Sequence, residues 1–193
     1  MEVPTKLLLG LGGASAAGIG SAAGYMHFFP SESKETFKSK YELALIQDNE
    51  NSIWTKKLST LNSGTPKHPS LISAKNKNNT DSLKKACQSL YNSTFSQDLM
   101  GDFKNFCSKN YSDTIGDKKP IEATTDIKTQ WADFKAKNND TLGGKLLDVH
   151  TSKKSSDNEP SDWKEQILTA CKSIASSIFE GEIKGYLDIC TKQ

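Results

Sequence analysis

Apolar residues along this chain recur every three or four positions, which is the spacing of one face of an α-helix. The pattern is clearest in four stretches, residues 83–90, 99–107, 163–178 and 183–190. Polar turns separate these stretches in pairs, near Ser93–Gln97 and at Glu180–Gly181. The pattern therefore predicts two helical hairpins in a mainly α fold that has at most a short β element.

The two predicted hairpins are copies of one sequence. Residues 83–109 align with residues 167–192 when a one-residue gap is allowed. The identical pairs are Ala86 with Ala170, Cys87 with Cys171, Ser89 with Ser173, Ser93 with Ser177, Phe95 with Phe179, Gly101 with Gly185, Cys107 with Cys190 and Lys109 with Lys192. The duplication divides the chain into an N-terminal segment (residues 1–30), repeat unit 1 (residues 31–110) and repeat unit 2 (residues 111–193).

Weaker patterns fill the rest of repeat unit 1. Residues 31–61 predict a helix that Ser31 caps and that the polar residues 48–51 break or bend. Residues 62–80 are polar and begin with turn-forming glycine and proline, so they predict a connection to the first hairpin.

Repeat unit 2 begins with an echo of this pattern. Residues 110–120 predict a linker, after which a helical face begins in which Trp131 takes the place of Trp54. Residues 138–160 predict a loop, within which residues 146–149 form a short strand or a buried turn. Each unit thus consists of a helix with a tryptophan, a polar loop and a cysteine hairpin.

All four cysteines lie on the apolar stripes of the hairpins, one on each arm. Antiparallel helices in contact can bring facing Cα atoms within disulfide range, so the candidate disulfides are Cys87–Cys107 and Cys171–Cys190. The alternatives are four reduced, buried thiols or a metal or redox role. The absence of a close Cys-x-x-Cys pair and of a neighbouring histidine disfavours zinc.

The N-terminal segment predicts a membrane anchor. Residues 7–29 contain no Asp, Glu, Lys or Arg, and a helix that crosses a bilayer needs about 20 residues. Small residues at Ala16, Gly20 and Gly24 would let two such helices approach closely, which makes self-association a candidate property. The alternatives are a signal peptide cleaved at Ser21–Ala23 and a buried helix of a soluble protein.

Two features disagree about the side of the membrane on which the body lies. Lys34, Lys38 and Lys40 come after the uncharged run, which favours the cytoplasm by the positive-inside rule. Paired cysteines favour an oxidising exterior, and a signal-like N-terminal segment usually directs the downstream chain out of the cell. We expect a single N-terminal anchor in the cell membrane, with the body outside the cell.

Composition narrows the classes of function. The chain has 25 basic and 23 acidic residues, and every basic residue is lysine. Balanced charge and the lack of arginine disfavour nucleic-acid binding. With 35% hydrophobic residues and a mean hydropathy of -0.60, we expect modest cores and a well-solvated surface. Abundant lysine and asparagine are typical of an AT-rich genome.

The sequence contains no recognisable catalytic pattern. It has no P-loop, no Gly-x-Ser-x-Gly and no His-Glu-x-x-His motif. His27, His68 and His150 have no partners at metal-ligand spacing, so we interpret them as surface residues without a role. The tryptophans lie on apolar faces and are expected to pack in the cores. We therefore predict no enzyme activity, no cofactor and no catalytic, cofactor-binding or metal-binding residue.

Three features of layout occur together. They are the start Met1–Gly24, with Pro4, a leucine run and a Gly/Ala tail, the tryptophan-then-cysteine hairpin, and the ending Cys190–Lys192. In these features the chain resembles the short hypothetical proteins that haemotropic mycoplasmas encode in large paralogous families. The resemblance implies a wall-less bacterium, a membrane-anchored or surface-exposed product and a part in host interaction or antigenic variety. It carries over no catalytic or binding residue.

These observations support two hypotheses about function. The first is a membrane-anchored surface protein whose helical repeats contact a host or bacterial surface protein. The alternative is a ligand-binding or enzymatic module with its site between the two repeat units. A structural membrane protein that associates only with itself is a third hypothesis.

Overall fold

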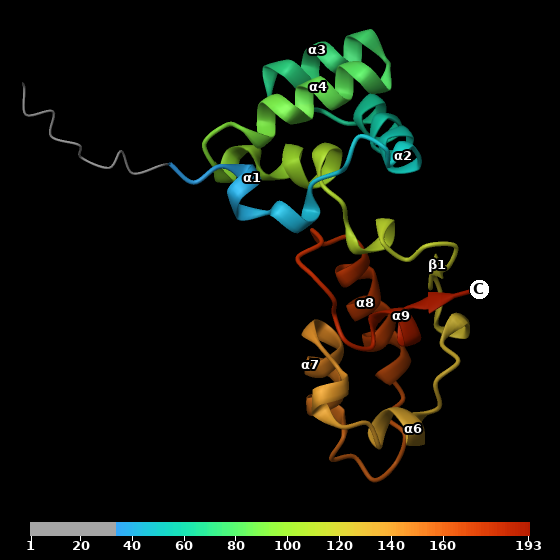
Figure 1. Cartoon of the computed structure of the whole chain (residues 1–193). Helices are drawn as coiled ribbons and strands as arrows, with labels where there is room; N and C mark the ends of the chain where they lie inside the picture. Colours follow the sequence, from blue (N-terminus) through green and yellow to red (C-terminus); the bar gives the residue numbers. More distant parts are fainter. Residues whose placement is uncertain (1–33) are drawn as a thin grey trace, which may run out of the picture. The chain divides into compact units, whose positions relative to one another are not determined.

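The computed structural model describes residues 34–193, and helices make up most of their regular structure (Figure 1). The α-helices are α1 (Phe37–Lys40), α2 (Asn51–Ser63), α3 (Pro69–Lys77), α4 (Thr80–Tyr91), α5 (Met100–Asp102), α6 (Trp131–Lys135), α7 (Gly144–Lys153), α8 (Trp163–Ala175) and α9 (Tyr186–Ile189). The shorter elements are the 3-10 turns η1 (Glu42–Ala44), η2 (Gln97–Leu99), η4 (Tyr111–Asp113), η5 (Thr124–Asp126) and η6 (Asn139–Thr141), the π-helical turn η3 (Phe103–Cys107), and the strands β1 (Lys119–Pro120) and β2 (Thr191–Lys192). For these residues, the predicted mainly α fold with a short β element is confirmed.

The predicted membrane anchor lies outside the described residues. This applies to the uncharged run 7–29, to His27 and to the capping residue Ser31. None of the helices in residues 34–193 combines the length and the apolar character that a bilayer-spanning helix needs.

The first arm of each predicted hairpin is a regular helix. At the start of α4, the Asn79 side chain accepts a hydrogen bond from the Ser82 N–H, which is one of the groups that a helix start leaves unpaired. The predicted apolar stripes are buried: Leu83, Ala86, Cys87 and Leu90 in α4, and Trp163, Ile167, Ala170, Cys171 and Ile174 in α8. Helix α8 ends at Ala175, so Ile178 lies beyond the helix to which the pattern assigned it.

The second arm of each hairpin differs from the predicted amphipathic helix. In repeat unit 1 it consists of α5 and then the π-helical turn η3, which carries Cys107. In repeat unit 2 it is only the single turn α9, before which Gly185 adopts a left-handed conformation with φ of 80°. Because this conformation interrupts the segment, Ile183 and Leu187 do not share one helical face, and Leu187 is 44% exposed.

Two helices occupy segments that the sequence predicts to be irregular. Helix α3 lies within the predicted connection 62–80, and α7 contains residues 146–149, predicted as a strand or a turn. Each of them lies beside a cysteine-bearing helix, α3 beside α4 and α7 beside α8 (Figure 1). Leu71 and Leu146 are fully buried in these pairs, so tertiary packing stabilises helices whose sequences are mostly polar.

The predicted helix 31–61 is also divided more sharply than expected. The Gln47 N–H donates a hydrogen bond to the Glu50 carboxylate over 2.6 Å, which stabilises a turn between η1 and α2. Just before this turn the backbone is extended, and the Lys109 N–H donates to the Ala44 carbonyl over 2.7 Å. The backbone of this segment therefore pairs with a distant segment instead of continuing a helix.

Two hydrophobic cores lie within the described residues. The first is formed by residues from α1 to η3 and also contains Ile178, while the second extends from Tyr111 to Cys190. The three tryptophans are buried in these cores, as predicted: Trp54 in the first, and Trp131 and Trp163 in the second. Residues 34–193 form one compact unit, so the division into separate units at residue 110 stays a prediction.

Equivalent residues of the two repeats make equivalent contacts. In each repeat a residue with an extended backbone forms a β-bridge to the segment that follows the cysteine-bearing helix. The residue after it is aromatic, and its ring centroid lies 5.2 Å from that of a phenylalanine, Phe95 or Phe179, which are aligned with each other. The bridges are Thr36–Thr94 and Asn110–Ile178, and the ring pairs are Phe37–Phe95 and Tyr111–Phe179. Later in each repeat, Leu45 bridges to Ser108, and β1 pairs antiparallel with β2, Lys119 opposite Lys192 and Pro120 opposite Thr191. These contacts therefore involve aligned residues of the two copies.

The aligned glycines of the two hairpins give a matched test. Gly185 has φ of 80°, and an added Cβ would lie 2.9 Å from a Leu142 methyl group, whereas a Cβ at Gly101 would meet nothing within 4 Å. Gly185→Ala should therefore lower the free energy of unfolding by about 1–3 kcal/mol, because strain and a clash add. Gly101→Ala should be neutral or stabilising by about 0.5–1 kcal/mol. Urea denaturation of both variants measures the difference, and equal effects would contradict it.

Candidate functional site

Both predicted cysteine pairs are disulfides in the structure. Cys87 is bonded to Cys107 and Cys171 to Cys190, with Cα–Cα distances of 5.3 and 5.1 Å. Each bond joins the regular first arm of a hairpin to the short second arm, and all four residues are buried. The disulfides thus connect the short second arms of the hairpins to α4 and α8.

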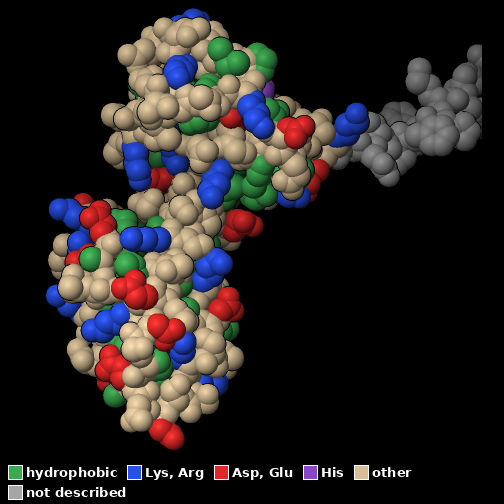
Figure 2. All heavy atoms as spheres, turned by 180° about the vertical axis from the view of Figure 1, so that it is seen from behind, with side chains coloured by type: hydrophobic (Ala, Val, Ile, Leu, Met, Phe, Trp, Pro, Cys, Tyr) green, Lys and Arg blue, Asp and Glu red, His purple; other side chains and the backbone are tan. Residues whose placement is uncertain are grey.

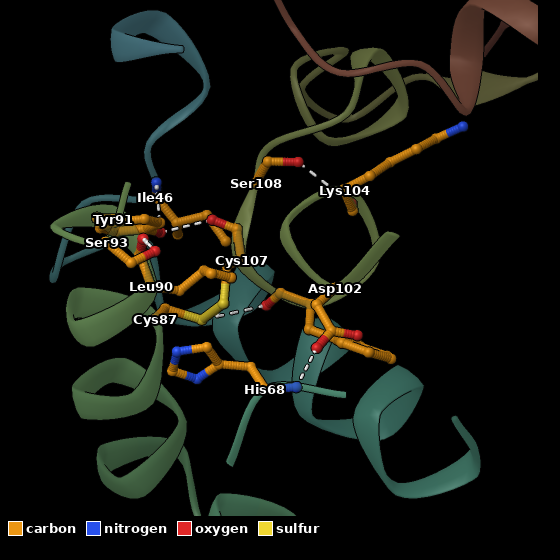
Figure 3. Close-up of a disulfide and its surroundings, with 11 residues drawn as sticks. Ile46, His68, Cys87, Leu90, Tyr91, Ser93, Asp102, Lys104, Cys107 and Ser108 are labelled. Atoms are coloured by element: carbon orange, nitrogen blue, oxygen red, sulfur yellow. Dashed lines mark hydrogen bonds between the residues drawn. A yellow bond between two sulfur atoms is a disulfide. The ribbon is translucent and has the colours of Figure 1, made fainter. Parts of the chain in front are cut away.

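Polar groups surround the first disulfide (Figure 3). The Tyr91 hydroxyl donates to the Cys107 carbonyl and accepts from the Ile46 N–H over 3.4 Å, and burial raises the pKa of this phenol. On another side, the buried Asp102 carboxylate accepts hydrogen bonds from the N–H groups of Lys67 and His68, at 2.8 and 2.6 Å. These contacts satisfy buried polar groups, so we assign them a structural role.

The two repeats meet beside the short stretch of paired backbone at the bridge Asn110–Ile178. The Tyr111 N–H donates to the Ser177 carbonyl over 3.2 Å, and the Phe179 N–H donates to the Lys109 carbonyl over 2.9 Å. Between these bonds lies Ile178, a residue of repeat unit 2 whose side chain packs in the first core and is 7% exposed. By the predicted bounds, the contacts that join the two repeats here are the Phe179–Lys109 backbone bond and the buried Ile178 side chain.

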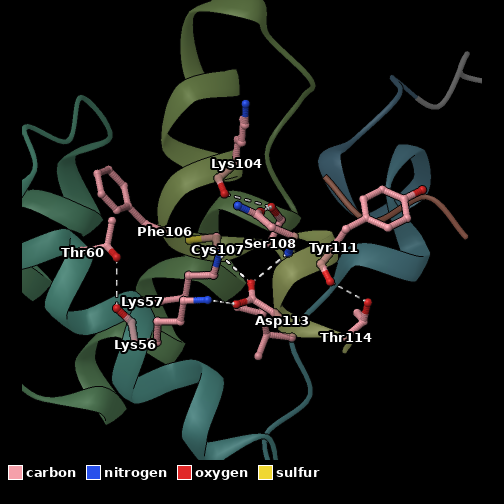
Figure 4. Close-up of polar contacts among 12 residues, drawn as sticks. Lys56, Lys57, Thr60, Lys104, Phe106, Cys107, Ser108, Tyr111, Asp113 and Thr114 are labelled. Atoms are coloured by element: carbon pink, nitrogen blue, oxygen red, sulfur yellow. Dashed lines mark hydrogen bonds and ion pairs between the residues drawn. The ribbon is translucent and has the colours of Figure 1, made fainter. Parts of the chain in front are cut away.

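A buried ion pair lies at the same junction. Lys57 of α2 places its Nζ atom 3.1 Å from an oxygen of Asp113 in η4, and the two side chains are only 4% and 1% exposed. The other carboxylate oxygen lies 2.6 Å from Lys56 Nζ, whose side chain is 57% exposed (Figure 4). The Asn110 N–H also donates to this carboxylate, over 2.9 Å. One carboxylate of repeat unit 2 thus serves two lysines of repeat unit 1.

The surroundings of this ion pair disfavour the charged form of Lys57 but favour the charged form of Asp113. Burial lowers the pKa of the Lys57 ammonium group, and Asp113 offsets this effect only in part. Burial of Asp113 favours its neutral form, but Lys57, Lys56 and the Asn110 N–H together keep the pKa of this carboxyl below its usual value. The difference arises because Asp113 has three stabilising partners, whereas Lys57 has one.

Lys57 is not among the predicted site residues, although the sequence contains a signal for it. Trp54, Lys57 and Leu61 are spaced by three and four residues, and all three are buried on one face of α2. A lysine on an apolar face indicates either an exposed stem or a buried partner. The partner itself lies in the predicted linker, where spacing gives no information.

A groove of about 320 Å³ runs beside this junction and is lined by both repeats. Repeat unit 1 contributes Lys56 and Lys57 from α2 and Asn105 from η3. Repeat unit 2 contributes Ile121, Glu122 and Lys172. Its size is at the lower end of the range for small-molecule sites.

One of the histidines predicted to lie on the surface packs inside the protein. His150, predicted as a surface residue, is instead buried in α7, with its ring edge-on to Phe134 at 5.4 Å. The prediction was wrong because residues 146–150 form a helix that turns this side chain inward.

Within residues 34–193, no group of His, Cys, Asp and Glu side chains is arranged to hold a metal ion. On the face shown in Figure 2, lysine and acidic side chains are interspersed and do not form a large patch of one sign.

Comparison of the chain with protein-family models, curated proteins and solved structures gives no match.

Proposed function

We propose that this chain is a membrane-anchored protein whose two disulfide-braced repeats lie outside the cell and contact other proteins. The observation that carries the proposal is the pair of buried disulfides. Disulfides persist in oxidising compartments and are rare where thiols are kept reduced. The uncharged run 7–29 supplies a segment long enough for an anchor or a signal.

A role in protein contacts is supported by the junction between the repeats. The buried ion pair, Ile178 and the paired backbone fix the two repeats to each other, so that a partner can contact both without ordering them first. The resemblance to the short hypothetical proteins of haemotropic mycoplasmas implies a surface-exposed product and a part in host interaction. The groove beside the junction favours a second candidate function, the binding of a small ligand.

The proposal is tested on protein taken from its native cell, with free thiols blocked at lysis. We expect non-reducing peptide mapping to recover Cys87–Cys107 and Cys171–Cys190 as linked peptides. We also expect a reagent that labels lysines but does not cross membranes to modify exposed lysines such as Lys85 on intact cells. Four blocked thiols, together with lysines that are labelled only after lysis, would overturn the proposal.

A further inference from the structure

The groove between the repeats has an unusual arrangement of charge. Lys56, Lys57 and Lys172 line it, against a single acidic side chain, Glu122. Asp113 lies beside the groove and is already bonded to both Lys56 and Lys57. Three ammonium groups thus face two carboxylates, which leaves one positive charge in excess.

Burial increases the effect of this excess charge. The Lys57 side chain is 4% exposed, and its pKa is lowered by that burial more than Asp113 raises it. An ammonium group in this environment is poorly solvated, so it gains from any further negative charge nearby. Electrostatic attraction is also stronger beside a buried group than on an open surface, because water screens it less.

The rest of the lining suits a small ligand with a short apolar part. Ile121 and Ala175 provide apolar wall, and Asn105 and Ser112 provide polar side chains. A volume of about 320 Å³ accommodates a small ligand but not a folded element. Both repeats contribute lysines, so an anion in the groove would bind across the junction.

We propose that the groove between the repeats binds an anionic group, a carboxylate or a phosphate, through Lys56, Lys57 and Lys172. Lys172 is the residue best suited to a test. It is exposed on α8, and no described residue forms a salt bridge with it. Its replacement should remove charge from the groove without disturbing the ion pair beneath.

The groove between α3 and α4 provides a matched control. It is larger, about 440 Å³, and is lined by Lys77 and Lys85 among serines and alanines. Lys85 is exposed, like Lys172, but none of the residues that line this groove is a buried lysine. Lys85→Gln therefore removes the same formal charge from the protein without changing the proposed site.

The test is equilibrium dialysis of the full chain in nanodiscs at low salt, with labelled inorganic phosphate or labelled glutarate. We expect one saturable equivalent of at least one probe, weakened about tenfold by Lys172→Gln and unchanged by Lys85→Gln. Saturation by phosphate alone assigns the site to phosphate groups, and saturation by glutarate alone assigns it to carboxylates. If neither probe saturates the protein, or if Lys85→Gln weakens binding as much as Lys172→Gln, the proposal is wrong.

Discussion

Replacing Cys87 and Cys107 together by alanine is expected to lower the free energy of unfolding by about 3 kcal/mol. The disulfide closes a loop with a sequence separation of 20 residues, and this closure restricts the unfolded chain. The double replacement of Cys171 and Cys190 should have nearly the same effect, because its separation is 19 residues. Urea denaturation measures both variants. A loss below about 1 kcal/mol in each would contradict the bracing role.

The tryptophans show which repeat is affected by each replacement. Trp54 lies in the first core, whereas Trp131 and Trp163 lie in the second, with their ring centroids 5.5 Å apart. Loss of the Cys87–Cys107 bond should therefore expose Trp54 at lower urea than the other two. Fluorescence of variants that keep a single tryptophan reports this order. Simultaneous exposure in both cysteine variants would mean that the junction couples the repeats into one cooperative unit.

The cysteine pairing could be predicted from the sequence because two independent patterns agree. Helical spacing places each cysteine on an apolar stripe, and the duplication repeats the arrangement. By contrast, α3 and α7 could not be predicted, because lysine, asparagine and serine dominate α3 and only a few apolar residues occur in each helix. Their stability depends on burying Leu71 and Leu146 against α4 and α8, and this contact is not visible in either segment alone.

The packing of the two repeats could not be predicted from the duplication, because it uses residues in which the copies differ. Alignment makes Ile178 equivalent to Thr94, yet Ile178 is buried in the first core and Thr94 is exposed. Asp113 and Ser39 occupy the same capping position after the extended residue of each repeat, and only the aspartate can pair with Lys57. The residues that the two copies share therefore give no information about either contact.

Replacing Asp113 by alanine is expected to cost roughly 3–5 kcal/mol, because it leaves Lys57 buried without its carboxylate. The Asn110 N–H also loses its acceptor. Asp162→Ala is the matched control, since it removes a carboxylate 2.9 Å from Lys153 in a pair whose side chains are 20% and 51% exposed. That surface pair should contribute at most about 1 kcal/mol. Urea denaturation at neutral pH compares the two variants.

The loss caused by Asp113→Ala should depend on pH in a defined direction. The pKa of Asp113 is lower in the folded protein than in the unfolded chain, where it is near the reference value of about 3.9. The carboxylate therefore stabilises the fold fully above the unfolded pKa, and this contribution is lost as the pH falls through the folded pKa. The difference between wild type and Asp113→Ala should shrink below about pH 4. A difference that stays constant into acid would mean that the ion pair is not its source.

A double variant separates the net stability that the ion pair contributes from the free energy that is lost when only one partner is removed. Taking two charges out of water costs free energy that their attraction offsets only in part, so replacing a buried ion pair by apolar residues of similar volume often leaves stability unchanged or higher. Lys57→Met combined with Asp113→Leu keeps similar side-chain volumes and removes both charges. We expect this variant to unfold within about 1 kcal/mol of wild type, or above it, and to show none of the acid dependence due to Asp113. If it is as unstable as Asp113→Ala, the ion pair itself holds the junction together, and the apolar contact of Ile178 alone is not sufficient.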